Sequence, residues 1–204
     1  MRIFRTLKRI IRILIIPLRE WPLIVKEFES IVLIIKYYAW PLIVLGALIK
    51  AGKVFLKFTD EVNLNQFKIP FSLTVLLFNM LVPLFVIIVG GSLISHLSKR
   101  MGASGQKNGA FRLLIYSYTP VFLATILINA EIHTPYLHNI GLISIYSVAL
   151  FWMGIGPVLE IPSERKFSFL ILSTMILSFL YFIMMFISRI SINLLYPDGV
   201  ILFL

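Results

Sequence analysis

The sequence predicts an all-α polytopic membrane protein, a bundle of five transmembrane helices with an N-terminal basic amphipathic helix at the membrane interface. Of the 204 residues, 59% are hydrophobic and only 14% are charged, whereas roughly a quarter of the residues of a soluble domain are charged. The mean hydropathy is +0.96. The apolar residues form segments long enough to cross a bilayer, and the positive charges gather at the N-terminus and in two loops. The absence of cysteine excludes disulfides, thiol catalysis and thiolate metal sites.

The first predicted element is a basic amphipathic helix over residues 1–16. Its arginines recur at three- and four-residue steps and therefore share one helical face, while apolar side chains occupy another. Such a helix is suited to lying on an anionic lipid surface. The candidate membrane-surface residues are Arg2, Arg5, Arg9 and Arg12. Prolines at positions 17 and 22 are expected to interrupt the helix, because proline removes a backbone hydrogen bond.

Five apolar segments follow, each close to the roughly 20 residues that a helix needs to cross the hydrocarbon core. Their predicted bounds are 34–56, 71–94, 110–130, 139–160 and 167–189. The chain is accordingly divided into an interfacial segment 1–33, a transmembrane domain 34–190 and a short tail 191–204.

The distribution of Lys and Arg predicts the orientation of the spans. Fourteen of the 19 cations lie in the N-terminal region through Lys36, in the loop after the second span, or in the turn before the fifth span. The segments on the two sides of the membrane thus differ strongly in their number of Lys and Arg residues, and segments rich in these residues favour the cytoplasmic side. We therefore expect a cytoplasmic N-terminus and an external C-terminus.

Two polar stretches invite functional interpretation but match no specific motif. The glycine-rich stretch 102–108 contains Lys107, yet it lacks the Gly-Lys-[Ser/Thr] ending and the preceding strand of a phosphate loop, so a flexible basic turn is the preferred interpretation. Glu131, His133 and His138 flank a proline in the next loop without the spacing of a zinc site. A polar external loop explains these three residues better than a metal centre does.

Ionisable residues at membrane depth are functional candidates because burying them is costly. Glu160 is the strongest, although an interfacial carboxylate paired with Arg165 and Lys166 is the favoured alternative. Lys50 and Lys53 either line a polar pathway or extend to the membrane surface.

Further polar candidates for helix packing are Asn79, Tyr116, Thr119 and Pro120. Tyr116 and Thr119 are three residues apart and share a face, so we expect them to contact another helix, with Asn79 as the suggested partner. The sequence shows no catalytic triad, no paired carboxylates within a span and no cofactor fingerprint. We expect no enzyme activity, no cofactor, no bound nucleotide and no nucleic acid.

The order of several elements resembles the prokaryotic branch of the Yip-domain family. The resemblance rests on IIPLREWPLIVKEFES followed by YYAWPLIVLGALI, on GGSLISHLSKRMGASGQKNGAFRLLIYSYTPVFLATIL, and on IGLISIYSVALFWMGIGPVLEIPSERKFSF. The second stretch is similar to that family's basic, glycine-rich loop and the "A-x-x-L-x-x-Y-S-x-T-P" passage after it. The acidic N-terminal region and "DLYGP"-type motif of eukaryotic members are absent, which favours a bacterial or archaeal member of the family, and we expect a bacterial inner-membrane protein.

The resemblance implies a non-enzymatic membrane protein linked to trafficking, membrane organisation or assembly with other membrane proteins. We therefore expect a structural or adaptor subunit that contacts anionic lipid headgroups and either other membrane proteins or further copies of itself. The alternative is a small transporter, a lipid-handling permease or an accessory subunit of an exporter, which the proline-interrupted spans and Glu160, Lys50 and Lys53 would serve.

Overall fold

The computed structural model describes residues 2–27, 30–57, 68–105, 108–130 and 140–196, and within these ranges every regular element is a helix. Three of the elements, labelled η, are single π-helical turns: η1 and η3 lie inside longer helices, and η4 ends the helix that begins with α9. The elements are α1 (Arg2–Ile15), α2 (Pro17–Lys26), α3 (Ile31–Ile34), η1 (Ile35–Ala39), α4 (Trp40–Lys57), α5 (Lys68–Phe85), η3 (Val86–Gly90), α6 (Gly91–Arg100), α7 (Gly109–Ser117), α8 (Thr119–Asn129), α9 (Ile140–Gly154), η4 (Ile155–Leu159) and α10 (Ser163–Leu195). The predicted all-helical class is confirmed for this part of the chain.

Four of the described helices are long and apolar enough to cross a membrane. They are Ile31–Leu56, Ile69–Arg100, Gly109–Asn129 and Ser163–Leu195. The predicted crossing at 139–160 corresponds to α9 and η4, where the described apolar helix Ile145–Leu159 is shorter than the other four. Four crossing-length helices and one shorter apolar helix are thus present, and a fifth crossing stays a prediction.

Two helix bounds differ from the sequence prediction. The second span continues as α6 to Arg100, whereas we expected it to end at residue 94. No proline or glycine interrupts the sequence between Ser92 and Arg100, so the helix continues to Arg100 and ends just before Gly102, which has a positive φ of 83°. At the N-terminus, Pro17 ends α1 as expected, but Pro22 lies inside α2.

The third span is interrupted in its middle. α7 ends at Ser117 and α8 begins at Thr119, with Pro120 in the first turn of α8. Proline is tolerated there because the first amide groups of a helix have no partner within the helix. Every residue of α7 except Phe111 is buried, so α7 forms the centre of the bundle.

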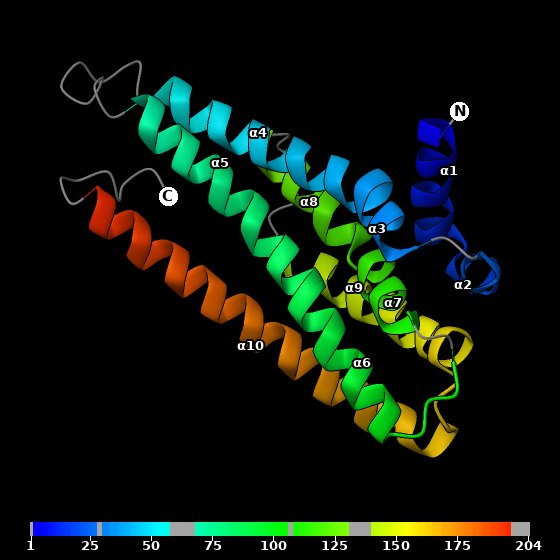
Figure 1. Ribbon diagram of the computed structural model, residues 1–204. Helices are drawn as coiled ribbons and strands as arrows, with labels where there is room; N and C mark the ends of the chain where they lie inside the picture. The colour runs from blue at the N-terminus through cyan, green and yellow to red at the C-terminus, as the bar shows by residue number, and fades with distance from the viewer. Residues whose placement is uncertain (1, 28–29, 58–67, 106–107, 131–139, 197–204) are drawn as a thin grey trace.

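The helices form an elongated bundle with an apolar core at each end (Figure 1). The larger core surrounds α7 and includes Trp21, Leu114, Ile155 and Phe169. The smaller core lies at the opposite end and consists of Val54, Phe71, Val75 and Ile192. α4 and α5 pack along their lengths, while α10 contacts α5, η3, α6 and α9.

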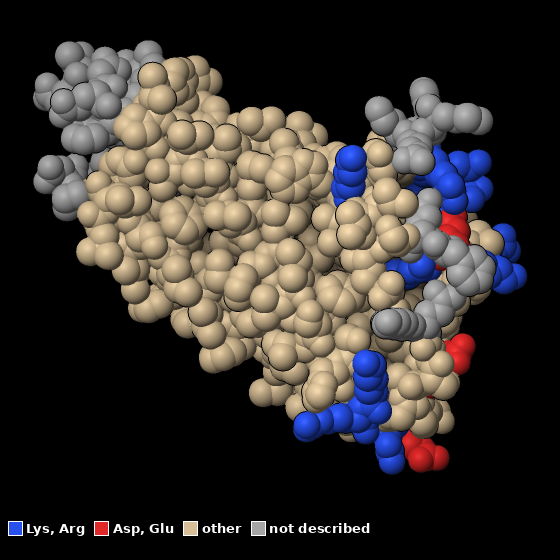
Figure 2. Space-filling view, viewed as in Figure 1, with Lys and Arg blue, Asp and Glu red and all other residues tan. Residues whose placement is uncertain are grey.

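The N-terminal helices α1 and α2 lie at the end of the bundle that contains the larger core (Figure 1). In the view of Figure 2 the Lys and Arg side chains gather at this end, and the long body of the molecule is almost free of visible charge. We call it the basic end. The distribution has the form expected of a membrane protein with one strongly basic face.

Candidate functional site

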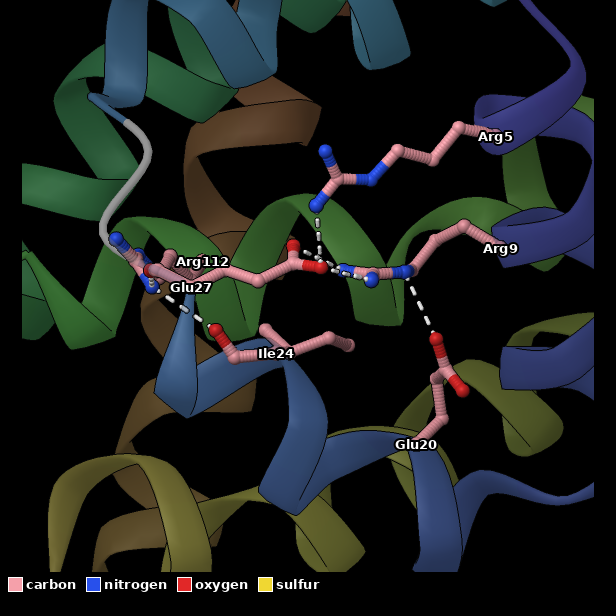
Figure 3. Close-up of polar contacts among 6 residues, drawn as sticks. All are labelled: Arg5, Arg9, Glu20, Ile24, Glu27 and Arg112. Atoms are coloured by element: carbon pink, nitrogen blue, oxygen red, sulfur yellow. Dashed lines mark hydrogen bonds and ion pairs between the residues drawn. The ribbon is translucent and has the colours of Figure 1, made fainter. Parts of the chain in front are cut away.

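The most densely charged site of the described structure is an ion-pair cluster between α1 and α2 at the basic end (Figure 3). Arg9 donates hydrogen bonds of 2.6 and 2.8 Å to the two carboxylate oxygens of Glu27. The Nε atom of Arg9 lies 2.8 Å from Oε1 of Glu20. Arg5 donates a third hydrogen bond to Glu27, of 2.7 Å. One arginine of α1 therefore joins two carboxylates of the following segment.

The side chains of the cluster differ in solvent exposure, and therefore in how much each ion pair stabilises the protein. The Glu20 side chain is only 2% exposed and that of Arg9 11%, whereas Arg5 is 61% exposed. Arg9 and Glu20 thus form a desolvated pair, and breaking such a pair leaves an uncompensated charge in the protein. The contact of Arg5 lies mostly in solvent and contributes little.

Aromatic rings pack against the side of the cluster that faces the bundle. The guanidinium of Arg9 lies 5.8 Å from the ring centroid of Tyr116, within the range of a cation–π interaction. The Tyr116 ring in turn packs edge-to-face against Tyr38, with centroids 4.6 Å apart, and against Trp21 at 6.5 Å. The cluster therefore links α1 and α2 to the first and third spans.

Arg112 of α7 binds the C-terminal end of α2. Its side chain is buried and donates hydrogen bonds to the backbone carbonyls of Ile24, at 2.9 Å, and of Glu27. The last carbonyl groups of a helix lack partners within the helix, and a cation satisfies them well. Arg112 therefore anchors the C-terminus of α2 to the centre of the bundle.

The electrostatics of the cluster favour its ionised form. Partial burial by itself raises the pKa of Glu27, but the hydrogen bonds and charges of Arg9 and Arg5 outweigh burial and lower the pKa overall. Burial by itself lowers the pKa of Arg9, and here the hydrogen bond and charge of Glu27 outweigh it, so that this pKa is raised. Both groups stay charged near neutral pH, which suits a permanent ionic lock and does not suit proton transfer.

The cavity beside the cluster is small. Its volume of about 70 Å³ compares with roughly 300–1,000 Å³ for pockets that bind small molecules. No group of three or more metal-ligating side chains occurs within the described residues. The cluster is therefore best described as a structural joint.

A second polar contact fixes the loop between α6 and α7. The Ser104 hydroxyl donates a 2.9 Å hydrogen bond to Glu160, and the amide of Gly105 donates to the carbonyl of Leu159 at 3.1 Å. A Cβ atom on Gly105 would lie 2.5 Å from the carbonyl oxygen of Val158, so only glycine allows this approach. Gly105 thus allows the backbone of the loop to pack against η4.

A larger cavity of about 440 Å³ lies between the two apolar cores, where α4, α5, α8 and α10 surround it. Its walls are mainly aliphatic and aromatic. Lys50 and Arg189 line it, together with Asn79, Tyr118, Thr125 and Tyr181. Lys53, the other lysine considered in the sequence, is not among the lining residues.

The structure distributes the predicted surface arginines over different environments. Arg9 points into the protein, Arg5 pairs with Glu27, and Arg12 is half-buried. The side chain of Arg2 lies outside the described part, as do Glu131, His133, His138 and Lys107. Of the three arginines whose side chains are described, Arg9 therefore faces the protein interior, and binding of this helix to the membrane surface stays a prediction.

The predicted packing residues have different partners from those suggested. Thr119 and Pro120 are buried, and the Thr119 hydroxyl lies 2.7 Å from that of Tyr38 and also donates to the Tyr116 carbonyl. Asn79 donates to the carbonyl of Val75 in its own helix, so the suggested contact of Thr119 with Asn79 is replaced by one with Tyr38. Glu160 has a left-handed backbone with φ of 53° and binds Ser104.

Sequence reasoning overlooked Glu20, Glu27, Tyr38 and Arg112. A usable signal was present, because Glu20 and Glu27 are carboxylates in an otherwise strongly basic N-terminal region. Their positions within a few turns of Arg9 indicated a possible pairing. The partners of Tyr38 and Arg112, however, are 81 and 88 residues distant, and no local pattern connects them.

Comparison with known proteins agrees with these observations. The sequence model of the Yip1 domain family matches residues 11–187, which is most of the chain. No curated protein and no solved structure matches it. The family match confirms the resemblance to the Yip-domain family, while membership of its prokaryotic branch stays a prediction, and the four crossing-length apolar helices agree with the match. The chain is thus an integral membrane protein that belongs to the Yip1 domain family.

Proposed function

We propose that this protein is a non-enzymatic structural or adaptor subunit that offers a rigid basic surface to a larger membrane assembly. The observation that carries the proposal is the ion-pair cluster, since Arg9 joins α1 to Glu20 and Glu27 while Arg112 holds the end of α2 on α7. A segment that only covered the membrane surface would need no such joint. The joint gives α1 and α2 one fixed orientation relative to the spans.

The outer faces of α1 and α2 suit both lipid and protein contacts. Leu7, Ile11 and Ile15 are between 51 and 72% exposed, which suits a helix whose apolar side enters the membrane interface. The cations Lys8, Arg19 and Lys26 are exposed and have no ion-pair partner within the described residues. We call these three residues the α1–α2 cations. They are available to anionic headgroups and to acidic segments of another membrane protein.

The proposal includes an orientation and a location. The basic end faces the cytoplasm, five helices cross the membrane, and the tail beyond residue 190 lies outside. A bacterial inner membrane is the proposed compartment, supported by the charge asymmetry.

Affinity purification of the full-length protein in mild detergent tests the adaptor function. The test variant reverses the α1–α2 cations (Lys8→Glu, Arg19→Glu and Lys26→Glu). A control with the same change in net charge reverses three exposed cations of α6 and α10, namely Lys99, Arg100 and Arg165. We expect the wild type and the control to retain the same membrane proteins, and the test variant to lose them at unchanged thermal stability. Recovery of the wild type alone, under conditions that preserve known complexes, would contradict the proposal.

The cavity between α4, α5, α8 and α10 favours a second candidate function, the handling of lipid. Its walls are mainly apolar, so the cavity suits a hydrocarbon chain better than it suits a polar solute. This candidate predicts lipid transfer between leaflets by the purified protein in vesicles. An adaptor that merely binds lipid would show no such transfer.

A further inference from the structure

The cavity between the two apolar cores has the length of one membrane leaflet. Along α4 its lining extends from Leu42 to Lys50, and along α10 from Tyr181 to Ile192. At 1.5 Å per residue these stretches are about 12 and about 16 Å long, close to half of the roughly 30 Å hydrocarbon core. The larger core closes the cavity toward the basic end, because Leu42, Val86 and Phe122 belong to both. The cavity therefore ends near the middle of the bilayer.

Three polar side chains of the wall already form hydrogen bonds within their own helices. Asn79 donates to the carbonyl of Val75, Thr125 to that of Val121 and Ser188 to that of Met185. These donors have no need of a polar ligand, and the remaining wall consists largely of Leu, Ile, Val and Phe side chains. A hydrocarbon chain fits such a lining, because it requires no hydrogen bonds.

Two cations stand at the other end of the cavity, away from the basic end. Lys50 is half-buried and Arg189 exposed, and neither has an ion-pair or hydrogen-bond partner in the part of the chain that the structure describes. Arg189 is six residues from the end of α10, at the depth expected for the membrane interface. Cations near a hydrocarbon region normally pair with an anion, and a lipid phosphate is an anion available at this depth.

We propose that this cavity binds an anionic phospholipid, with an acyl chain between α4, α5, α8 and α10 and the headgroup on Lys50 and Arg189. The two positive charges favour a headgroup with net negative charge over one whose phosphate is neutralised by its own ammonium group. An apolar transmembrane helix of a partner would bring no anion to these two cations, whereas a phospholipid supplies both an acyl chain and a phosphate. The cavity holds about 440 Å³. The site is independent of the adaptor surface, since α1 and α2 contribute no lining residue.

Native mass spectrometry of the full-length protein in mild detergent tests the proposal, with phosphatidylglycerol and phosphatidylcholine of identical acyl chains as probes. We expect the wild type to retain phosphatidylglycerol preferentially. The variant Lys50→Gln/Arg189→Gln should retain it about 30-fold less, as expected when two cations near a phosphate are neutralised. Lys53→Gln/Lys99→Gln removes the same charge outside the cavity and should behave as the wild type.

A second variant tests the acyl site separately from the headgroup site. Val121 is half-buried and lines the cavity from α8. Val121→Phe should fill part of the space and reduce the retention of both lipids, with no loss of thermal stability. Should this variant fail to fold, the comparison of the two lipids on the wild type and on the double Gln variant still decides the question.

Equal retention of the two lipids by the wild type would overturn the proposed headgroup site. Retention of phosphatidylglycerol by Lys50→Gln/Arg189→Gln at the level of the control would overturn it as well, and would move lipid binding to another cation cluster such as the basic end. The variant in which the α1–α2 cations are reversed should lose its co-purified proteins but retain phosphatidylglycerol as the wild type does. This result would support both the adaptor surface and the lipid site. The failure of one is therefore distinguishable from the failure of the other.

Discussion

Replacing Arg9 with methionine should destabilise the protein far more than the same replacement of Arg5. Both arginines belong to α1 and both pair with Glu27 at about the same distance, 2.6 and 2.7 Å. They differ in burial, since the Arg9 side chain is 11% exposed and that of Arg5 61%. Methionine keeps most of the length and apolar volume of the side chain, so the charge is the main difference that the comparison tests.

The expected magnitudes follow from that difference in burial. Arg9→Met leaves the Glu20 carboxylate, which is 2% exposed, without its ion-pair partner. Removing one partner of a buried ion pair costs about 3–5 kcal/mol. Arg5→Met removes a mostly solvated pair, which contributes about 0–1 kcal/mol. The double variant Arg9→Met/Glu20→Gln should recover part of the loss, because no buried charge is then left unpaired.

Chemical unfolding in mild detergent measures these differences through tryptophan fluorescence. Trp21 is fully buried beside Tyr116 and reports on this end of the bundle. Trp40→Phe and Trp152→Phe in the background remove the signals of the two other, exposed tryptophans. If Arg9→Met and Arg5→Met lower the free energy of unfolding by the same amount, within 1 kcal/mol, the Arg9–Glu20 ion pair is not a strongly stabilising buried pair.

Three further predictions concern neighbouring contacts. The ion pairs of Glu27 lower its pKa in the folded protein. They therefore stabilise the fold at pH values above the ordinary pKa of about 4.3, and this stabilisation is lost as pH falls through the lower pKa of the folded state. Acid titration of stability should show this loss, and Glu27→Gln should abolish that part of the pH dependence. Tyr38→Phe should lower the free energy of unfolding by about 1 kcal/mol through the lost hydrogen bond to Thr119, measured by the same unfolding assay, and a change near zero would contradict it. Gly105→Ala should lower the melting temperature, since its Cβ would lie 2.5 Å from a carbonyl oxygen of η4, whereas the matched control Gly52→Ala meets no atom within 4 Å and should leave the temperature equal or higher.

The sequence by itself determined the class of the protein and the approximate position of its helices. Hydropathy and charge are local properties of the chain, so apolar segments of crossing length and the basic regions around them were visible without coordinates. The interruption of the third span at Pro120 and the end of α1 before Pro17 were equally local, because proline removes a backbone donor wherever it occurs.

The tertiary structure alone decided which polar side chains meet. A helix of known bounds can still turn about its axis, and that rotation is set by packing against neighbours distant in the sequence. It directs Arg9 toward Glu20 and Glu27 instead of toward lipid, and it brings Tyr38 to Thr119 across 81 residues. The cavity between α4, α5, α8 and α10 likewise arises from the spacing of four helices, which no single segment of the sequence encodes.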